Sequence, residues 1–295
     1  MSDKTKGLCF AMLAMLGGGL YAIPYRLSLI TVEPLTVIWA VFLWAFLFSL
    51  PGAWLARRQT KYSWKIGGIA LVTSLAGLLG NYAICQALNQ ASPTLLILVS
   101  RSEIIIAMLL SWLFLKEFVS IRVWLAAVLI ISGIVVMKMG SLSFELKDWS
   151  VFLWAITAAF SFASMQVMAK SIIHEINPQV LNVSRLAIGL VILWSLAEVR
   201  SGVAELQISE WKWLALAAFC GPFMGRVSYT YALRYLTVSK AVIIGSFSPA
   251  TTLLFEFIVF GTLISSYEAF GGIIMLAAIL WVFLPGLRRS VKLAM

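Results

Sequence analysis

The chain of 295 residues is 62% apolar and only 12% charged, and its mean hydropathy is +0.98. Soluble domains carry about 25% charged residues, so this composition argues against a water-soluble fold. The formal net charge is +10, but the basic residues stand between apolar segments, a pattern that membrane orientation explains without a nucleic-acid partner.

Ten apolar segments follow one another along the chain. A hydrocarbon core of about 30 Å needs about 20 apolar residues per helix, and the segments have about this length. In chain order they span 7–28, 34–56, 65–87, 93–115, 119–139, 149–170, 179–199, 211–233, 239–263 and 267–286. We therefore expect an all-α polytopic membrane protein with ten transmembrane helices. The first segment follows a short basic tail, as in a signal peptide, but it belongs to a repeat and is expected to stay as an uncleaved helix.

The same unit occurs twice in the chain. The matched segments are 17–26 (GGGLYAIPYR) with 161–170 (SFASMQVMAK), and 79–92 with 224–237. Each unit, 1–140 and 141–295, holds five predicted helices. Because five is an odd number, the second unit must enter the membrane from the side opposite to the first. Inverted repeats of this kind are typical of secondary transporters.

The basic residues predict how the helices are oriented. One alternate set of loops and ends is rich in Lys and Arg, whereas the other set mixes a few basic residues with acids. The positive-inside rule places the first set in the cytoplasm, so both termini are expected there, in a multi-pass protein of the cytoplasmic (inner) membrane. The first set comprises Lys4, Lys6, Arg57, Arg58, Lys61, Lys65, Lys116, Arg122, Lys170, Arg234, Lys240, Arg288, Arg289 and Lys292.

No segment indicates catalysis or a cofactor. His174 is the one histidine, so a Ser/His/Asp triad or a multi-histidine metal site would lack its parts. No GxxxxGK[ST] phosphate loop occurs. The cysteines Cys9, Cys85 and Cys220 lie within predicted helices without the spacing of a metal site. We expect a protein that is not an enzyme and that binds no metal and no cofactor.

Several short motifs occur in both copies in the same order. The first copy contains Tyr82 to Leu88 with Ala91, Ser92 and Pro93, followed by Leu115, Lys116, Glu117 and Gly133. The second contains Tyr229, Tyr231, Ala232 and Leu233, followed by Ser246, Ser248 and Pro249. In this order and doubling the chain resembles the drug/metabolite transporter superfamily, in its ten-helix form built from two EamA-type domains. The resemblance covers nearly the whole chain and implies transport by alternating access.

The resemblance extends to two basic residues and fails at three places. Arg185 is similar to the arginine often found in the second helix of each domain, and Lys170 to the lysine that ends the first helix. We expect both to lie near the cytoplasmic boundary, where anchoring in headgroups is favoured and contact with a substrate is the alternative. The family has a proline region in the fourth helix of a domain and a Leu-x-Glu ("LxE") motif after it, which is Leu115-Lys116-Glu117 in the first copy. The departures are Trp39 where the first copy would have the arginine, Arg101-Ser102-Glu103 where it would have the proline region, and Gly261-Thr262 where the second copy would have the "LxE" acid.

Charges inside the predicted helices are the sharpest local signal. An ionised side chain deep in hydrocarbon costs at least about 2.5 kcal/mol, so such residues face a cavity or a partner. Arg101 and Glu103 lie near the middle of segment 93–115. Two positions apart on a helix, they point to nearly opposite sides and cannot simply pair. We expect one to line a cavity and the other to meet a neighbouring helix, and either residue fits either role.

Comparison of the two copies predicts further residues that line the cavity. Arg226 stands where the first copy has Asn81, and equivalent helices of inverted repeats surround a common axis. The candidate substrate-binding residues are Asn81, Arg101, Arg226, Tyr229, Ser246 and Thr252, and the candidate coupling or ion-pair residues are Glu103 and Glu256.

These residues favour a secondary transporter of small organic metabolites that exports amino acids or related zwitterionic or anionic compounds. Its expected partners are a small-molecule substrate, membrane lipids and protons as a candidate coupling ion, and it is expected to be a monomer or a homodimer. Uptake or exchange of phosphorylated or cationic metabolites is the alternative within transport. A polytopic membrane enzyme or lipid-handling protein is the alternative outside it, with no catalytic constellation in its favour.

Overall fold

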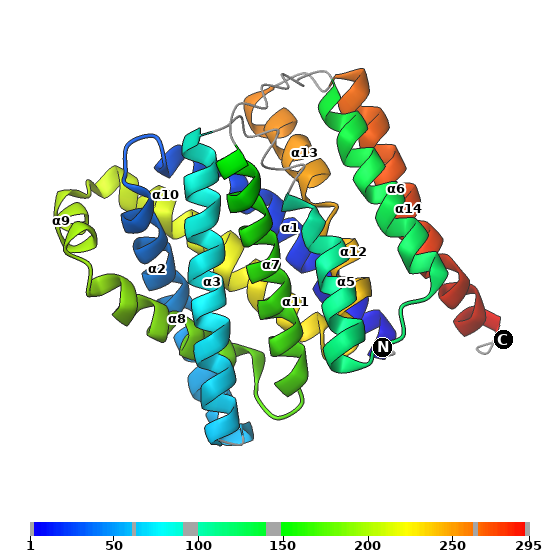
Figure 1. Cartoon of the computed structure of the whole chain (residues 1–295), viewed down its shortest axis with the longest axis horizontal. Helices are drawn as coiled ribbons and strands as arrows, with labels where there is room; N and C mark the ends of the chain where they lie inside the picture. The colour runs from blue at the N-terminus through cyan, green and yellow to red at the C-terminus, as the bar shows by residue number, and fades with distance from the viewer. Residues whose placement is uncertain (1–2, 61–62, 91–99, 140–148, 262–264, 293–295) are drawn as a thin grey trace.

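The computed structural model describes residues 3–60, 63–90, 100–139, 149–261 and 265–292. Within these ranges every regular element is a helix (Figure 1). The helices are α1 (Asp3–Ser28), α2 (Pro34–Ala56), η1 (Arg57–Gln59), α3 (Trp64–Gln90), α5 (Ser102–Leu115), α6 (Ile121–Lys138), α7 (Trp149–Ile172), α8 (Pro178–Trp194), α9 (Ala197–Glu205), α10 (Ile208–Ala218), η3 (Phe219–Gly225), α11 (Arg226–Ala232), α12 (Val238–Gly245), α13 (Ser248–Phe260) and α14 (Ser266–Lys292).

Helix occupies at least part of each of the ten predicted segments. Five described stretches are long and apolar enough to cross a bilayer: Asp3–Tyr25, Pro34–Ala56, Trp64–Ala87, Phe152–Ile172 and Val238–Phe255. The bent pair of α8 and α9 would make a sixth, while α5, α6 and α14 contribute shorter apolar helices. A multi-pass helical membrane protein is therefore confirmed, and the count of ten spans stays a prediction.

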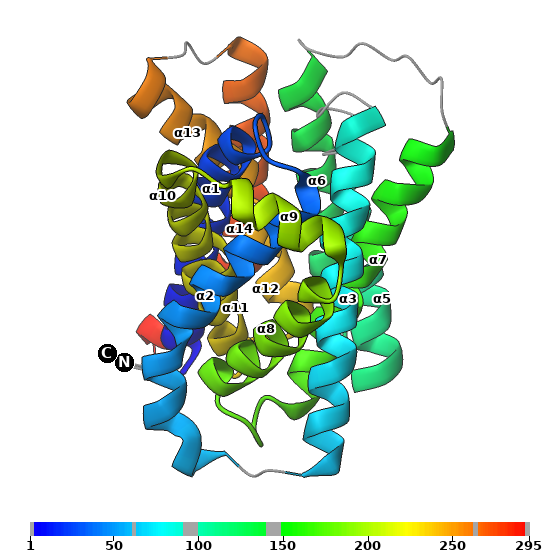
Figure 2. The same cartoon turned by 90° about the vertical axis from the view of Figure 1, so that its left-hand side faces the viewer.

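The predicted helix over 179–199 is broken. Its first part, α8, ends at Trp194, and α9 leaves at 96° to it (Figure 2). Arg200 of α9 donates from Nη1 to the carbonyls of Trp194 at 3.2 Å and Ser195 at 3.3 Å. A cation at these carbonyls satisfies the end of α8, so the polar sequence that follows turns aside instead of continuing as one helix.

The predicted helix over 211–233 contains a π-helical turn, η3, between α10 and α11. Pro222 lies inside this turn, and proline cannot donate the hydrogen bond that a regular α-helix requires. α1 packs directly on η3, because a Cβ added to Gly17 would lie 2.6 Å from the carbonyl oxygen of Cys220 and 2.8 Å from Gly225. The glycine run in α1 thus allows the two backbones to meet, as helix contacts in membranes often require.

Most contacts between helices of the first and second halves follow the repeat: the contact has a counterpart in which the equivalent helices have changed places, or it joins two equivalent helices. α3 packs on α7 as α10, η3 and α11 pack on α1, whereas α2 pairs with α8 and α6 with α14. The described residues with positive φ also lie at equivalent places in the two halves: Lys116 (φ 54°) ends α5 and Gly261 (φ 65°) ends α13. These two positions have the same sequence offset as the matched segments 79–92 and 224–237. The duplication seen in the sequence is therefore also present in the backbone.

The start of α1 and the last described turn of α14 lie at the same end of the molecule (Figure 1). α5, α7 and α11 also end there, and we call this end, which carries Lys65, Lys170 and Arg234, the basic end. Large apolar side chains cover the outside of the bundle, among them Trp64 and Leu55. Such an apolar exterior suits lipid rather than water.

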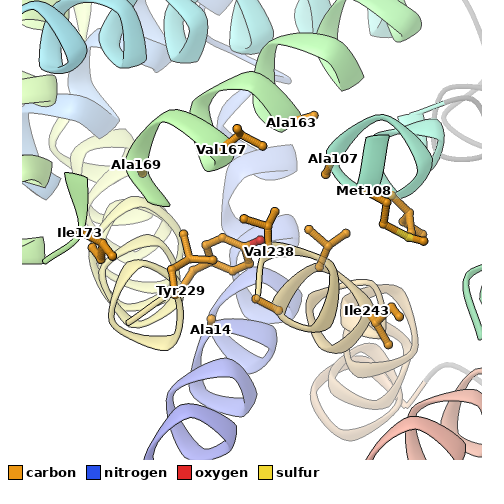
Figure 3. Close-up of a cluster of buried hydrophobic side chains, with 14 of the residues drawn as sticks. Ala14, Ala107, Met108, Ala163, Val167, Ala169, Ile173, Tyr229, Val238 and Ile243 are labelled. Atoms are coloured by element: carbon orange, nitrogen blue, oxygen red, sulfur yellow. The ribbon is translucent and has the colours of Figure 1, made fainter. Parts of the chain in front are cut away.

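The core near the basic end is built from small and branched side chains of α1, α5, α7, α11 and α12 (Figure 3). Ala107 and Ala163 are completely buried and lie where α5 meets α7. Alanines at such contacts allow close approach of helices. The tight packing fixes Tyr229 of α11, which belongs to the same cluster, and so holds one wall of the cavity described next.

Candidate functional site

A small buried cavity lies among α3, α7, α8 and α11. Its polar lining consists of Thr73, Gln166, Asn182, Arg185, Arg226, Tyr229 and Thr230. The space open to the centres of water molecules is about 20 Å³, which is room for about one water. The cavity has the polar groups of a binding site, but it must widen before it can hold a metabolite.

Arg185 of α8 points into this cavity and is only 6% exposed. Its Nη2 donates to Asn182 Oδ1 at 2.9 Å, and its Nη1 lies 3.6 Å from Met165 Sδ. Room for the guanidinium comes from Gly77, where an added Cβ would lie 3.2 Å from Nη1. The expectation that Arg185 anchors in headgroups is therefore wrong, because the packing of α8 on α2 and α3 turns this face of the helix inward.

Asn182 holds the guanidinium in place. Its Oδ1 accepts from Arg185, while its Nδ2 donates to Ser49 Oγ at 3.0 Å and to the carbonyl oxygen of Pro222 at 3.1 Å. The first of these amide contacts reaches α2 and the second reaches the π-helical turn. Arg185 is thus positioned against the very turn after which Arg226 begins α11.

Arg226 is the second cation of the cavity. Its guanidinium lies 5.8 Å from the ring of Phe162 and within electrostatic range of Glu103, Tyr229 and Tyr21. Arg226 also acts electrostatically on Arg185, and like charges in a low-dielectric interior repel. Among the described residues that line the cavity there is no carboxylate, so the pair offers a ready place for an anion.

Glu103 of α5 is linked to the cavity by a short hydrogen-bonded chain. Gln166 of α7 donates from Nε2 to Glu103 Oε1, and Tyr229 of α11 donates from its hydroxyl to Gln166 Oε1 at 2.6 Å. Gln166 and Tyr229 are both buried and both line the cavity. Side chains from three helices therefore form one hydrogen-bonded unit. Within it Glu103 lies behind Gln166 and Tyr229, which line the cavity.

Of the residues singled out from the sequence, the structure brings Arg226, Tyr229 and Glu103 together. Asn81, Ser246 and Thr252 do not belong to the cavity lining, and their side chains donate hydrogen bonds to backbone carbonyls. Asn81 donates to Gly77 O at 2.7 Å and Ser246 to Val242 O at 2.7 Å, whereas Thr252 donates to Gly19 O and Ser248 O, both at 3.0 Å.

The remaining two candidates from the sequence are Arg101 and Glu256. Arg101 is the N-cap residue of α5, not the middle of a described helix, and its Nε is buried without a hydrogen-bond partner among the described residues. It does not belong to the cavity lining. Residues 93–99 of the same predicted segment lie outside the described residues, as does the side chain of Glu256.

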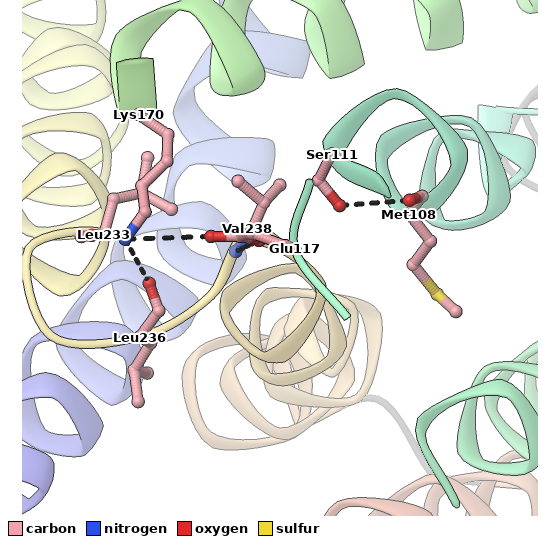
Figure 4. A network of polar contacts seen from close by, with 7 residues as sticks. All are labelled: Met108, Ser111, Glu117, Lys170, Leu233, Leu236 and Val238. Carbon is pink, nitrogen blue, oxygen red and sulfur yellow. Dashed lines mark hydrogen bonds and ion pairs between the residues drawn. The ribbon is translucent and has the colours of Figure 1, made fainter. Parts of the chain in front are cut away.

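Lys170 lies at the basic end, in a polar network of α5, α7 and the α11–α12 turn (Figure 4). Its Nζ donates to the carbonyls of Leu233 and, at 2.9 Å, Leu236, and it lies 3.9 Å from Glu117 Oε1. The prediction that Lys170 anchors in headgroups is also wrong, since carbonyls at the end of α11 attract the cation inward.

Glu117 completes this network from the other side. Its Oε2 accepts from the backbone N–H of Val238 at 2.9 Å, at the start of α12. The left-handed Lys116 turns the chain so that Glu117 can reach this helix start, which gives the "LxE" motif a structural role. Burial raises the pKa of the Glu117 carboxyl, while the Val238 N–H and the charges of Lys170 and Lys240 act to lower it.

Sequence reasoning missed Gln166 and Asn182. A signal for Gln166 exists, because it stands one turn before Lys170 and one turn after Phe162 on the same face of α7. Asn182 precedes Arg185 by three residues and shares its helix face in the same way. A polar residue one turn from a buried charge is a frequent partner of that charge.

Both halves of the chain are similar to one known protein family. The model of the EamA-like transporter family matches residues 5–139 and again 149–284. A probable transport protein of Saccharomyces cerevisiae is 34% identical over 74 residues, 25% of this chain and 21% of that protein. An uncharacterized membrane protein of the same yeast is 30% identical over 91 residues, 31% of this chain and 21% of that protein. The matched regions thus span about a fifth of either relative.

A solved crystal structure superposes with a TM-score of 0.76 at 17% identity, covering 97% of this chain and 99% of the other. At this identity the likeness shows the fold alone. The family model, in contrast, matches nearly the whole chain, in two successive copies that agree with the repeated helix contacts. The chain therefore belongs to the EamA-like transporter family of the drug/metabolite transporter superfamily.

Proposed function

We propose that the protein carries small carboxylate-bearing metabolites, amino acids and related zwitterionic compounds first, and that their carboxylate binds between Arg185 and Arg226. The observation that carries this proposal is the convergence of two guanidinium groups on one cavity, that of the buried Arg185 and that of the half-buried Arg226. A guanidinium matches a carboxylate in a planar, charge-assisted pair of hydrogen bonds. An anion between the two cations would also offset their mutual repulsion.

Transport follows from alternating access of the two halves, 1–140 and 141–295, in opposite orientations. The cavity is too small for a metabolite in this state, and the basic end is held together by the network of Lys170 and Glu117. Opening that end would widen the cavity toward the cytoplasm, and opening the other end would release the substrate outside. Export is the direction that we propose.

A thermal-shift screen of the purified protein tests the substrate class, because a ligand that binds only the folded state raises the apparent melting temperature. The library should pair each carboxylate with its neutral amide and include amines and phosphate esters. We expect carboxylates to stabilise the protein and their amides not to do so. Stabilisation by amines alone would contradict the proposal, and stabilisation by phosphate esters alone would favour the exchange of phosphorylated metabolites.

Counterflow into liposomes then tests transport itself. Protein reconstituted with an unlabelled hit inside should accumulate the labelled hit from outside, for a time, without any other source of energy. Conversion of the hit into a product without counterflow would contradict a carrier and favour a membrane enzyme.

A further inference from the structure

We propose that Glu103 is a proton-binding site and that Gln166 transmits its charge to the cavity by setting whether the Tyr229 hydroxyl accepts or donates a hydrogen bond there. The inference rests on the proposed function, because it assigns the coupling proton to the same cavity. It makes Gln166 a positioning residue rather than a substrate ligand.

The chain of three side chains has a definite direction in this structure. Gln166 donates its amide hydrogen to Glu103, and its amide oxygen accepts the hydroxyl hydrogen of Tyr229. An ionised carboxylate can only accept, so this direction is the one that a charged Glu103 requires. The Tyr229 hydroxyl hydrogen is then used within the chain, and only its oxygen lone pairs remain for the cavity.

Protonation of Glu103 reverses the chain. A neutral carboxyl has a hydrogen to donate, and the Gln166 amide oxygen can accept it if the amide turns end for end. The Gln166 amide nitrogen then donates to the Tyr229 oxygen, which frees the Tyr229 hydroxyl hydrogen. Tyr229 lines the cavity together with Arg226, so one proton on Glu103 adds one hydrogen-bond donor to the anion site.

The surroundings of Glu103 make its charge matter for Arg226. The charged or titratable groups that act on Glu103 are Arg101, just before it on α5, and Arg226 and Tyr229 of α11. α7 contributes Gln166, while Lys240 of the neighbouring α12 acts on Glu117. When Glu103 takes a proton from solution, Arg226 loses the electrostatic attraction of that carboxylate and interacts more strongly with a substrate anion. Proton and anion are therefore expected to bind together.

Infrared difference spectroscopy of the substrate-free protein, with ring-labelled tyrosine, tests the relay directly. On acidification a carboxyl band of Glu103 should appear, and a tyrosine band should change with the same pH midpoint. Glu103→Gln should remove both signals. Gln166→Leu should keep the carboxyl band and lose the tyrosine change, which a merely structural role of Gln166 would not predict.

Tyr229→Phe assigns the tyrosine band, and Tyr267→Phe, at an exposed tyrosine of α14, is its matched control. If the wild type shows the carboxyl band without a linked Tyr229 signal, or no carboxyl band at all, the relay is wrong. This result needs no ligand and no Gln166 variant, so it decides the matter even if Gln166→Leu does not fold.

Acetate as a small anionic probe gives the second measurement. The ratio of its dissociation constants at alkaline and acidic pH should be at least about tenfold, about 1.4 kcal/mol, in the wild type and should fall toward one in Glu103→Gln. In Tyr229→Phe the ratio should lie between these values, because only the electrostatic part remains. An unchanged ratio in Tyr229→Phe contradicts the relay, whereas the absence of anion binding at every pH contradicts the proposed function and leaves the infrared result to decide the relay.

Discussion

Lys170 and Arg234 cap each other's helices at the basic end. Lys170 of α7 donates to the carbonyls of Leu233 and Leu236 where α11 ends. Arg234, just beyond α11, donates to Ile173 O at 3.2 Å and Ile176 O at 2.9 Å where α7 ends. Each cation meets the negative end of the other helix, so the two helix ends cannot separate without breaking both sets of contacts.

We expect Lys170→Met and Arg234→Met each to lower the free energy of unfolding by about 1–3 kcal/mol, since each removes charged hydrogen bonds to half-buried carbonyls. The control is Lys6→Met, because Lys6 is exposed and pairs with Asp3 at 3.3 Å, a surface pair worth about 0–1 kcal/mol. Thermal melts in detergent provide the measurement. Equal melting temperatures for all three variants would show that the reciprocal caps do not hold this end together.

The Glu117 carboxyl predicts a dependence of stability on pH. Because its pKa is raised by burial in the folded protein, the folded state binds the proton more tightly than the unfolded state does. Its favourable contribution is complete below the ordinary pKa of 4.5 and is lost as pH rises through the folded value. The melting temperature of the wild type, measured relative to Glu117→Gln, should therefore fall from acidic toward neutral pH. A rising difference would mean that Lys170 and Val238 outweigh burial.

Alanine should have opposite effects on stability at a glycine in the crowded contact of α6 with α14 and at glycines that face open space. A Cβ on Gly271 would lie 2.3 Å from the carbonyl oxygen of Gly133 and 2.6 Å from the backbone nitrogen of Met137. Backbone atoms cannot move aside, so Gly271→Ala should lower stability by about 1–3 kcal/mol. Gly67 and Gly68 in α3 face open space, and alanine there should raise stability by up to about 1 kcal/mol. Destabilisation by Gly67→Ala as large as by Gly271→Ala would contradict this packing.

Hydropathy located the helices because the cost of exposing polar backbone to lipid applies to every span. It did not reveal the bend after Trp194 or the π-helical turn at Pro222, because both depend on local hydrogen bonds. Arg200 satisfies the carbonyls that end α8, and α1 packs on the turn through Gly17. Neither contact leaves a mark in the average hydropathy of a segment.

The candidate site was only partly predictable for a related reason. The repeat pointed to Arg226 and the charge pattern pointed to Glu103, but neither shows which face of a helix turns inward. Arg185 was expected in headgroups because of its position along α8, and the decisive factor was the packing of α8 on α2 and α3. The helix face of Gln166 could be read from the sequence, but its link to Glu103 and Tyr229 depends on contacts between three helices.

Orientation in the membrane is open to a direct test. Reporters fused after Arg122 or at the C-terminus should report the cytoplasm, and a reporter inserted within 201–208 should report the outside, because the basic residues gather at the other end. A cytoplasmic signal from 201–208 would contradict the inverted arrangement of the two halves. A fusion after Arg58 serves as a second cytoplasmic control in the first half.

The two cavity arginines predict the effect of single substitutions on binding. Arg185→Ala and Arg226→Ala should each weaken binding of the carboxylate found in the screen by at least about tenfold, the loss of about 1.4 kcal/mol expected for one charge-assisted contact. Lysine at either position keeps the charge but not the planar fork, so it should restore only part of the affinity. Arg200→Ala is the matched control, since Arg200 is exposed on α9 and caps α8. Binding should be measured by isothermal titration on protein that still melts cooperatively, which separates a lost contact from a lost fold. Unchanged affinity in both alanine variants would remove the carboxylate from the space between Arg185 and Arg226.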